Sequence, residues 1–452
     1  MRMRDELEDA KFGDLRLTKR LVRVAEQLAA KPDATFPEAA GSDGAVLGTY
    51  RFLNHDAVTP QRILEPHIAA TVKRAAEAGT VIVAHDTTEF HFKGEREGVG
   101  WVNTSGTRGF FGHFALALTA DGTRRPLGIV GMQVVTRHGA PRNHPKHRAP
   151  EDRESRRWHD LADAVGTRLR SHARVIHVMD READSYRLLA QLLAAGDGFV
   201  IRMCTDRRVD AGPALVHVND RMAAAERRFV REVPLSARKV STTRRGKRHP
   251  PRAKRMATLG FNALPLEILR PEHEHAPLPK SLRLNIIRVF EVDTPADVEP
   301  VEWTLITTEP IGTVDEVAAA VDAYRARWMI EEFFKAIKTG CAFERRQLES
   351  LHALLNALAV FAPIAWNLLL LRQLGRADDS APVSTVLTPL QLRILHKKAK
   401  LVEHPTIRQA MLAVAQLGGH IKNNGDPGWI VLGRGYEKLL VLEEGARAAL
   451  EM

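Results

Sequence analysis

Cysteine is almost absent from this chain of 452 residues, which contains only Cys204 and Cys341. The two residues lie far apart in the sequence, and neither belongs to a Cys-x-x-Cys pair. A disulfide framework and a zinc site built from thiolates are therefore excluded.

The chain also lacks an uninterrupted apolar segment of membrane-spanning length. Residues 1–14 have no apolar core between their charges, so we expect no secretory signal there. Residues 354–371 are long enough to cross a bilayer as a helix, but Asn356, Pro363 and Asn367 interrupt them. Because a lipid-facing helix tolerates such polar groups poorly, we expect a buried helix or helix pair in a cytoplasmic protein.

Acidic residues are fewer than basic ones, 55 Asp and Glu against 66 Lys and Arg, for a net charge of +11. This balance favours a nucleic-acid partner over an acidic metabolite, with a membrane surface as the weaker alternative. Residues 238–255 contain nine Lys or Arg and no acid. A solvated loop is one interpretation, but so dense a basic run favours contact with phosphate. The candidate residues in this run are Arg244, Arg245, Lys247 and Arg248.

The first part of the chain predicts a compact helical unit that ends near residue 60. A helix is expected over residues 16–31, with Leu17, Leu21, Val24 and Leu28 forming its apolar stripe. A neighbouring face of that helix is basic, and it carries Arg16, Lys19, Arg20 and Arg23. The glycines between residues 41 and 48 are expected to break the helical pattern. Such a unit fits a DNA-binding module, although the basic face alone is also typical of a solvated helix.

From residue 81 the pattern changes to strands. Strands are predicted at residues 81–86, 110–118, 127–135, 175–180 and 199–203, and helices at 154–165 and 184–195. The turn Asp121-Gly122 predicts that the second and third strands form an antiparallel pair. Three strands, helix, strand, helix, strand is the order of a ribonuclease H-like sheet. Residues 205–302 then predict a polar insertion that is mostly β-strand.

Two acidic residues are predicted to end strands of this sheet, Asp86 and Asp180. In sheets with helices on their faces, ligands gather at the carboxyl ends of strands, although acids there also serve as caps and turn residues. Glu331 would supply a third carboxylate. Three oxygen donors fit a hard cation, either magnesium or manganese.

Residues 324–338 predict a helix with an unusual polar face. At about 100° per residue, Met329, Ile330, Phe333 and Ile337 fall on one side. The other side collects Tyr324, Arg327, Glu331 and Lys338. A carboxylate held among phosphate-binding donors indicates a site where a metal and a polyanion meet. A chance cluster of charges is the alternative interpretation.

The last part of the chain predicts a small helical domain after a linker at residues 377–382. Within it, Met411, Val414 and Leu417 have helical spacing over residues 407–417. Few chemically active residues accompany them, so packing or dimerisation is favoured over a second active site.

Several motifs together resemble the bacterial cut-and-paste DDE transposases of the transposon-five type, in the fourth insertion-sequence group. They are FGDLRLTKRL and YRFLN near the start, DTT at Asp86, DREAD at Asp180, the spacing Y-x2-R-x3-E-x6-K from Tyr324 to Lys338, and LGGHIKNNGDPGW near the end. Their order and number make the resemblance specific, and it extends over almost the whole chain.

This resemblance implies that Asp86, Asp180 and Glu331 bind two Mg²⁺ ions, for which Mn²⁺ could substitute. It implies cleavage of transposon ends through a hairpin intermediate and then strand transfer into target DNA. The residues that would hold the DNA end are Tyr324, Arg327, Lys338 and Arg202. Trp303, which stands 21 residues before Tyr324, would stack on a base flipped out of the duplex.

The expected fold class is therefore α/β, with a ribonuclease H-like catalytic domain over residues 60–376 that contains the β insertion at about 205–302. A helical DNA-binding domain over 1–59 precedes it, and a helical dimerisation domain over 377–452 follows. We expect a homodimer in the synaptic complex with double-stranded DNA, in the cytoplasm and associated with the nucleoid. Two alternatives stay open: a metal-dependent nuclease or resolvase of the same fold, and a non-catalytic DNA-binding inhibitor of transposition.

Overall fold

The computed structural model forms two compact units. Unit 1 comprises Met1–Arg157, Thr167–Ala173 and Trp328–Met452, and unit 2 comprises Trp158–Gly166 and Arg174–Arg327. The structure describes residues 2–450 except 103–105, 138–154, 211, 213–215, 236, 238–240, 243–247, 250, 297, 377–381 and 422–424.

Unit 1 begins with five helices: α1 (Met3–Leu7), α2 (Leu15–Ala30), α3 (Phe36–Ala40), α4 (Asp43–Leu53) and α5 (Pro60–Ala78). The helix predicted at residues 16–31 is confirmed as α2, and the Asp14 side chain caps it by accepting a hydrogen bond from the backbone N–H of Arg16. Of the predicted stripe, Leu21, Val24 and Leu28 are buried, while Leu17 is half-buried.

The expected helix break at residues 41–48 is wrong from Asp43 onwards, because α4 starts there and passes through two glycines. Ser42 caps this helix through a hydrogen bond from the backbone N–H of Ala45. At Gly48 a Cβ atom would lie 2.3 Å from Nη1 of Arg20. This glycine thus allows a side chain of the α2 basic face to approach the backbone of α4 closely.

The strands of unit 1 are β1 (Thr80–His91), β2 (Gly100–Trp101), β3 (Arg108–Thr119) and β4 (Pro126–Val135). The predicted antiparallel pair is confirmed as β3 and β4, and β1 pairs antiparallel with the other side of β3. β1 is longer than predicted. Its ladder continues to the pair His91 and Gly109, so Asp86 lies inside the strand and not at its end. The β-branched and aromatic residues that follow Asp86 extend the strand pattern, which explains the correction.

The remaining elements of unit 1 are helical. They are α10 (Trp328–Lys335), the π-helical turn η4 (Ala336–Gly340), the 3-10 turns η5 (Phe343–Arg345) and η6 (Val383–Thr385), α11 (Leu351–Arg376), α12 (Pro389–Ala399), α13 (Ile407–Leu417) and α14 (Trp429–Leu450). The helix predicted at 407–417 is confirmed with the same bounds. Met411 and Val414 are buried in it, and Leu417 is half-buried.

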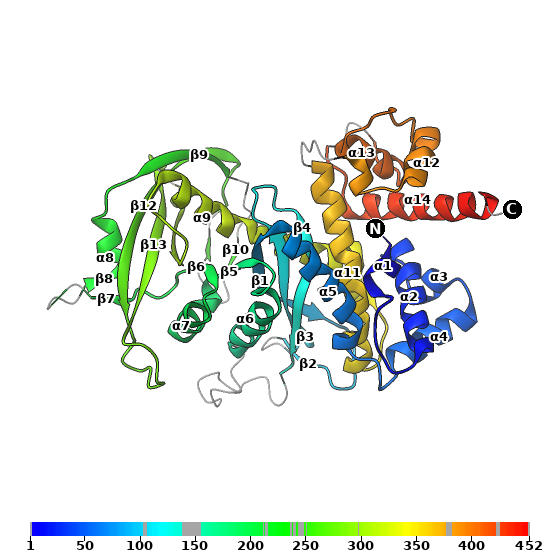
Figure 1. The fold of residues 1–452 in the computed structure, drawn as a ribbon, viewed down its shortest axis with the longest axis horizontal. Coiled ribbons are helices and arrows are strands. Elements are labelled where there is room, and N and C mark those ends of the chain that lie inside the picture. The colour runs from blue at the N-terminus through cyan, green and yellow to red at the C-terminus, as the bar shows by residue number, and fades with distance from the viewer. Residues whose placement is uncertain are drawn as a thin grey trace. The chain divides into compact units, whose positions relative to one another are not determined.

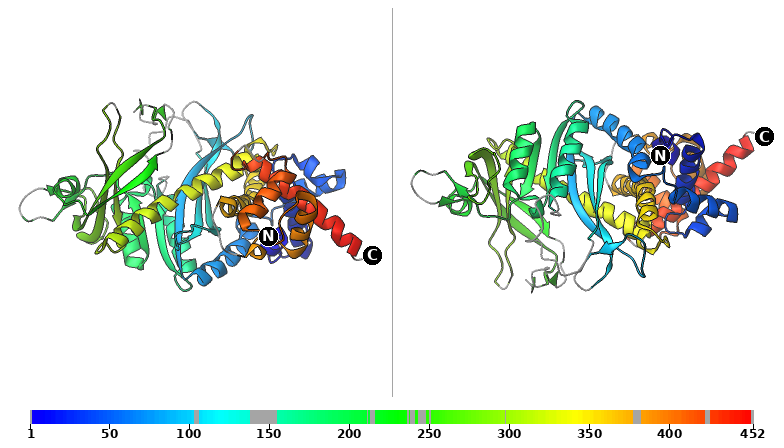
Figure 2. Two further views of the ribbon diagram at one scale, coloured as in Figure 1. Left: turned by 90° about the horizontal axis from the view of Figure 1, so that it is seen from above. Right: turned by 90° about the horizontal axis from the view of Figure 1, so that it is seen from below.

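The apolar run at residues 354–371 forms the middle of α11, a single helix that continues through Pro363. It packs against α2, α4, α5, α13, α14 and β4, and Figures 1 and 2 show it among the other helices of unit 1. Among the described residues, α11 is the one helix long and apolar enough to cross a membrane, but 89% of its most apolar window is buried inside the structure. The prediction of a buried core helix is confirmed.

The predicted order of helix, strand, helix and strand, which follows the first three strands, is present. It runs from α6 (Arg156–Leu169), whose residues are divided between the two units, through β5 (Arg174–Met179), the 3-10 turn η3 (Arg181–Ala183) and α7 (Tyr186–Ala195) to β6 (Gly198–Arg202). β5 and β6 are parallel, as expected for a crossover through a helix.

The region between residues 205 and 302 is rich in strands, as predicted. It contains β7 (Arg208–Val209), β8 (Val216–His217), α8 (Val218–Ala223), β9 (Phe229–Leu235), β10 (Ser241–Thr242), β11 (Arg248–His249), β12 (Arg255–Leu269) and β13 (Ser281–Val292). β14 (Glu302–Thr307) and α9 (Val314–Ala326) complete unit 2. Its strands follow the order β5-β6-β14-β13-β12-β7-β8, with β9 also on β12, and β10 and β11 form a separate pair.

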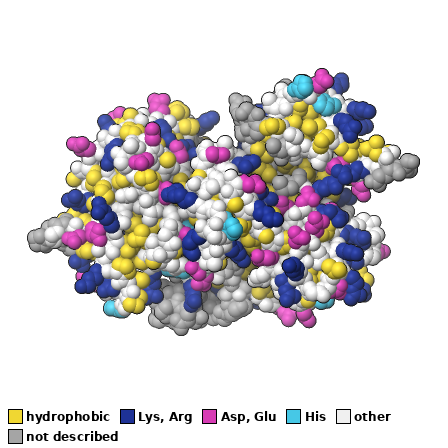
Figure 3. Space-filling model, viewed as in Figure 1, with side chains coloured by type: hydrophobic (Ala, Val, Ile, Leu, Met, Phe, Trp, Pro, Cys, Tyr) yellow, Lys and Arg dark blue, Asp and Glu magenta, His cyan; other side chains and the backbone are white. Residues whose placement is uncertain are grey.

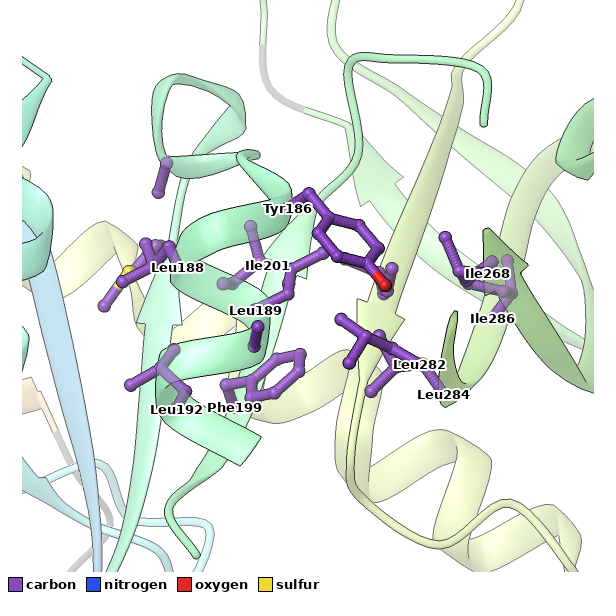
Figure 4. Close-up of a cluster of buried hydrophobic side chains, with 14 of the residues drawn as sticks. Tyr186, Leu188, Leu189, Leu192, Phe199, Ile201, Ile268, Leu282, Leu284 and Ile286 are labelled. Atoms are coloured by element: carbon purple, nitrogen blue, oxygen red, sulfur yellow. The ribbon is translucent and has the colours of Figure 1, made fainter. Parts of the chain in front are cut away.

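A hydrophobic core joins the first and second halves of unit 2. Figure 4 shows Leu189 and Leu192 of α7 near Phe199 of β6, while Leu282 and Ile286 of β13 lie on the side of the second half. Tyr186 belongs to the same core, and its hydroxyl donates a 3.0 Å hydrogen bond to the carbonyl of Pro279. The strand-rich region is thus packed onto the sheet that carries Asp180.

A buried polar network fixes the first helix of unit 1. Glu6 Oε2 lies 2.6 Å from Nδ1 of His67, and Arg74 Nη1 donates to Glu6 Oε1 at 2.8 Å. The other ring nitrogen of His67 accepts a hydrogen bond from the backbone N–H of Ile129. His67 is therefore neutral and donates from Nδ1, in agreement with a pKa lowered by burial. Burial alone raises the pKa of Glu6, but the hydrogen bonds from His67 and Arg74 lower it to about 2.

We predict that Glu6→Gln destabilises the protein by about 3 kcal/mol at pH 7, because a carboxyl pKa lowered from 4.5 to about 2 stabilises the folded state. A depressed pKa gives stability that is complete above about pH 4.5 and is lost as the pH falls towards 2. Urea unfolding of both proteins across this range measures the effect. A difference between them that stays constant from pH 7 to pH 3 would contradict this assignment.

Candidate active site

Asp86 lies half-buried within β1, directly opposite Phe114 of β3. Residues directly opposite in an antiparallel pair project to the same face of the sheet. The Phe114 ring contacts the rings of Phe333 and Phe334 in α10, with centroid distances of 5.3 and 5.9 Å. α10 therefore covers the face of β1 and β3 to which Asp86 belongs.

Glu331 lies in the first turn of α10, two residues before Phe333, and it is half-buried. Its neighbour Glu332 is engaged in ion pairs with Arg372 at 2.7 Å and Lys335 at 2.5 Å. Packing against β1 thus brings Glu331 to the same side of the strand as Asp86, whereas Glu332 ties α10 to α11.

Lys338 approaches β1 on the same face. Its ammonium group donates to the backbone carbonyl of Glu89, lies 5.4 Å from the centroid of the Phe90 ring, and lies 3.8 Å from Glu344. Phe90 is four residues from Asp86 in β1, so both project to one face. Burial lowers the pKa of Lys338, and the charge of Glu344 opposes this shift.

The continuous helix predicted over residues 324–338 is wrong in detail. α9 ends at Ala326, α10 starts at Trp328, and Lys338 lies in the π-helical turn η4. A π-helix changes the angle per residue, so the predicted single polar face does not extend along the segment. Of the predicted apolar side, Ile330, Phe333 and Ile337 are buried and Met329 is half-buried.

On the opposite face of β1, a chain of hydrogen bonds surrounds Thr87. Its hydroxyl accepts from Nε of Arg157 at 2.9 Å and lies 2.9 Å from Nδ1 of His113, the residue directly opposite it in β3. Burial, with a contribution from the charge of Arg157, lowers the pKa of His113 to about 3. His113 is therefore neutral, and its ring and the Arg157 guanidinium both contact the Thr87 hydroxyl beside Asp86.

In unit 2, Asp180 directly follows β5, so its predicted place at a strand end is confirmed. Its carboxylate accepts a 2.8 Å hydrogen bond from the backbone N–H of Glu182 and caps η3. The last acid of the DREAD motif, Asp184, has a different environment. It is fully buried and pairs with Arg207 at 2.7 Å. Asp184 is thus a structural residue, while Asp180 stays half-exposed.

Tyr324 is the centre of a polar group in unit 2. Burial raises the pKa of its phenol, the positive charges of Arg327 and Arg202 lower it, and the negative charge of Asp180 raises it. Tyr324 also forms a side-chain hydrogen bond with Arg327. The structure therefore brings together four of the predicted site residues, because α9 packs on β5 and β6, whose ends carry Asp180 and Arg202.

Trp303 lies in β14, opposite Val289 of β13, and its side chain is half-buried. The next strand position, Thr304, accepts a 2.8 Å hydrogen bond from the backbone N–H of Met203, which follows Arg202. Trp303 thus lies near the end of β6, on the same sheet as the group around Tyr324.

The remaining predicted DNA-contacting residues lie in α2 and in the basic run at residues 238–255. In α2, Arg16, Lys19 and Arg23 are exposed and Arg20 is half-buried. Arg16 forms a 2.8 Å ion pair with Asp14. In the basic run, Arg248 begins β11, and the predicted residues Arg244, Arg245 and Lys247 lie outside the described residues.

The three carboxylates of the predicted triad are divided between the units, with Asp86 and Glu331 in unit 1 and Asp180 in unit 2. Over the part of the chain that the structure describes, no three His, Cys, Asp or Glu side chains form a group that could hold a metal ion. The triad therefore stays a prediction. Its donor set fits a hard divalent cation, because each member is a half-buried carboxylate that offers oxygen ligands.

Several residues near the site were not predicted from the sequence to have a role. They are Thr87, His113 and Arg157 beside Asp86, and the buried pair of Asp184 and Arg207. His113 could have been found by aligning the predicted strands, because the register of β1 and β3 places it directly opposite Thr87. Arg157 and Arg207 have no such signal, since each reaches its partner through tertiary packing.

Two family models match the chain. Residues 3–58 match the model described as Transposase DNA-binding. Residues 77–368 match the model described as Transposase DDE domain. The second match covers more than half of the chain and includes Asp86, Asp180 and Glu331.

We predict that Asp184→Asn and Asp180→Asn differ sharply in their effect on stability. Asp184→Asn leaves the Arg207 guanidinium buried without its counter-ion and should cost about 3–5 kcal/mol. Asp180→Asn keeps a residue that caps well and should cost less than about 1 kcal/mol. Guanidinium unfolding of the two variants checks this, and equal losses would contradict the structural role of Asp184.

Proposed function

Because the chain belongs to the family of transposases with a DDE domain, we propose that Asp86, Asp180 and Glu331 form its catalytic triad. Membership makes the protein a metal-dependent enzyme that cleaves phosphodiester bonds and transfers DNA strands. The match of its N-terminal residues makes DNA its partner.

The observation that best supports this proposal is the grouping of complementary charges in each unit. In unit 1, Glu331 and Lys338 approach the face of β1 that carries Asp86. In unit 2, Asp180 lies with two arginines around Tyr324. Carboxylates accompanied by phosphate-binding cations fit an enzyme that acts on a phosphodiester.

We propose Mg²⁺ as the natural metal, held by the three carboxylates as two ions, with Mn²⁺ as a substitute. Bound Mg²⁺ would lower the pKa of the attacking water and neutralise charge on the leaving oxygen. The three carboxylates would supply oxygen ligands, and each of them is half-buried and so partly accessible to water and phosphate oxygens. The backbone N–H of Thr87 donates a 2.7 Å hydrogen bond to Asp86 Oδ1, which restricts the orientation of this carboxylate.

Tyr324, Arg327, Arg202 and Lys338 are proposed to hold the phosphates of the DNA end. Burial raises the pKa of Tyr324, so its hydroxyl keeps its proton and can donate to a phosphate oxygen. The two arginines offer paired N–H donors that match phosphate geometry. Lys338 contributes a compact charge close to the Phe90 ring.

Trp303 is proposed to stack on a base that leaves the duplex while a hairpin forms at the cleaved end. Its half-buried indole beside the end of β6 fits such a platform. We further propose that the enzyme is of the transposon-five type, with a ribonuclease H-like catalytic domain, and that it works as a homodimer in the cytoplasm.

We predict that Glu331→Ala reduces Mg²⁺-dependent cleavage of a duplex carrying the element's terminal repeat to background. Glu332→Gln is the matched control, because Glu332 lies on the same helix turn but is paired with Arg372 and Lys335. Cleavage per folded molecule should persist in the control. Undiminished cleavage by Glu331→Ala would overturn the triad, and a wild-type enzyme that cuts without joining strands would support the nuclease alternative.

For Trp303, we predict that Trp303→Ala slows hairpin formation about tenfold or more while first-strand nicking continues, since stacking on an aromatic ring contributes about 1–3 kcal/mol per base. Trp303→Phe should recover part of the rate. Resolving nicked, hairpinned and open products on a denaturing gel measures both steps. Hairpin formation at the wild-type rate in the alanine variant would remove the stacking role.

A further inference from the structure

The C-terminal helices of unit 1 carry a compact group of cations that the proposed active site does not use. Arg393, Lys397 and Lys398 of α12, together with Lys400 directly after it, are all exposed. In the part of the chain that the structure describes, none of these four side chains forms an ion pair or a hydrogen bond. We call this group the α12 basic face, and Figure 3 shows Lys and Arg side chains gathered over α12.

The spacing of Arg393 and Lys397 places their charges on one side of the helix, because they are four residues apart. Lys398 lies about 100° around the helix from Lys397, and Lys400 follows the end of α12. The opposite side of α12 carries the buried Gln391 and Leu395 and packs against α13 and α14. The basic side is therefore the one turned to solvent.

Few acids lie near enough to neutralise the α12 basic face. Between residues 382 and 421 the sequence contains one acid, Glu403. On the adjacent helix α14, Glu443 is buried and accepts hydrogen bonds from Gln391 at 2.7 Å and Arg447 at 2.8 Å. Like charges at helical spacing repel each other, and no carboxylate among the described residues forms an ion pair with these four cations.

Two ordinary explanations account for only part of this arrangement. Lysines in the last turn stabilise a helix through its dipole, which explains Lys397 and Lys398 but not Arg393. Lys400 has a φ of 51°, a conformation that favours glycine or asparagine after a helix. Glycine or asparagine at residue 400 would fit this backbone conformation better than lysine, but neither would carry a positive charge.

We propose that the α12 basic face binds the phosphate backbone of the target DNA duplex. Three of its four cations are lysines, which contact phosphate as point charges and do not read base edges in a paired geometry. Such a surface fits a duplex that is accepted without a defined sequence. This inference rests on DNA being the partner of the enzyme, and it adds a contact outside both matched family regions.

The test compares two double variants of the full-length protein. Lys397→Gln with Lys400→Gln removes two charges from the α12 basic face. Arg434→Gln with Lys438→Gln removes two charges from α14, where Glu437 already lies close to both. DNA affinity is measured against salt concentration with a duplex of random sequence and with a duplex that carries the terminal repeat.

We expect the α12 variant to flatten the slope of log K against log salt by about 2 on the random duplex, since each lost phosphate contact removes about 0.9. The α14 variant and the charge-preserving pair Lys397→Arg with Lys400→Arg should keep the wild-type slope. Cleavage of the terminal repeat should continue in all three, which separates this inference from the catalytic triad.

A slope for the α12 variant equal to that of the α14 variant would overturn the proposal and leave a solvated helix face. A change confined to the duplex with the terminal repeat would also overturn it, because the occupant would then be the transposon end. A lower midpoint of thermal unfolding with an unchanged slope would assign the lysines to helix stability alone.

Discussion

The contact of Phe114 with Phe333 and Phe334 is the interaction on which the proposed catalytic arrangement of unit 1 depends. It fixes helix α10 on the face of the sheet that carries Asp86, because Phe114 is the residue directly opposite Asp86 in the ladder. The position of Glu331 follows from that packing, since it lies two residues before Phe333 in the same helix. A shift of one residue in the pairing of β1 and β3 would turn Asp86 to the other face, away from α10.

Electrostatics in unit 2 complement this packing. Burial of the Tyr324 phenol keeps it protonated, and the charges of Arg202, Arg327 and Asp180 surround it. The fold separates acids that hold the structure from acids that stay accessible. Asp184 is fully buried with Arg207, whereas Asp180 uses one oxygen as a cap and remains half-exposed. Asp180 and Asp184 of the DREAD motif thus have different roles, because the carboxylate of Asp184 is buried and that of Asp180 is half-exposed.

Much of the fold could be predicted from the sequence, because the signals are local. The strands at Asp180 and around Asp121, the helix α2 and the core helix α11 follow from hydrophobic periodicity and turn residues. The position of Asp86 inside β1 could not be predicted, since strand length depends on pairing with β3. Tertiary packing determines the break between α9 and α10 near Arg327 and the π-helical turn at Lys338. A helical wheel drawn from the sequence therefore cannot predict either of them.

The site residues were predicted from motif spacing and family resemblance more than from physical chemistry. Composition alone indicated a nucleic-acid partner, and two carboxylates at strand ends alone fitted caps as well as metal ligands. What the structure adds is a physical reason for each orientation: Thr87 and His113 hold the backbone beside Asp86, and Glu332 anchors α10 beside Glu331.

The central proposal is that Asp86, Asp180 and Glu331 bind the catalytic metal ions. Titrating Mn²⁺ into the complex of the enzyme with its terminal-repeat DNA, followed by electron paramagnetic resonance, counts the bound ions directly. The account predicts two ions for the wild-type enzyme and a loss of bound Mn²⁺ for each of Asp86→Asn, Asp180→Asn and Glu331→Gln. A variant that binds as many ions as the wild type, with unchanged affinity, would contradict the assignment of its residue to the triad.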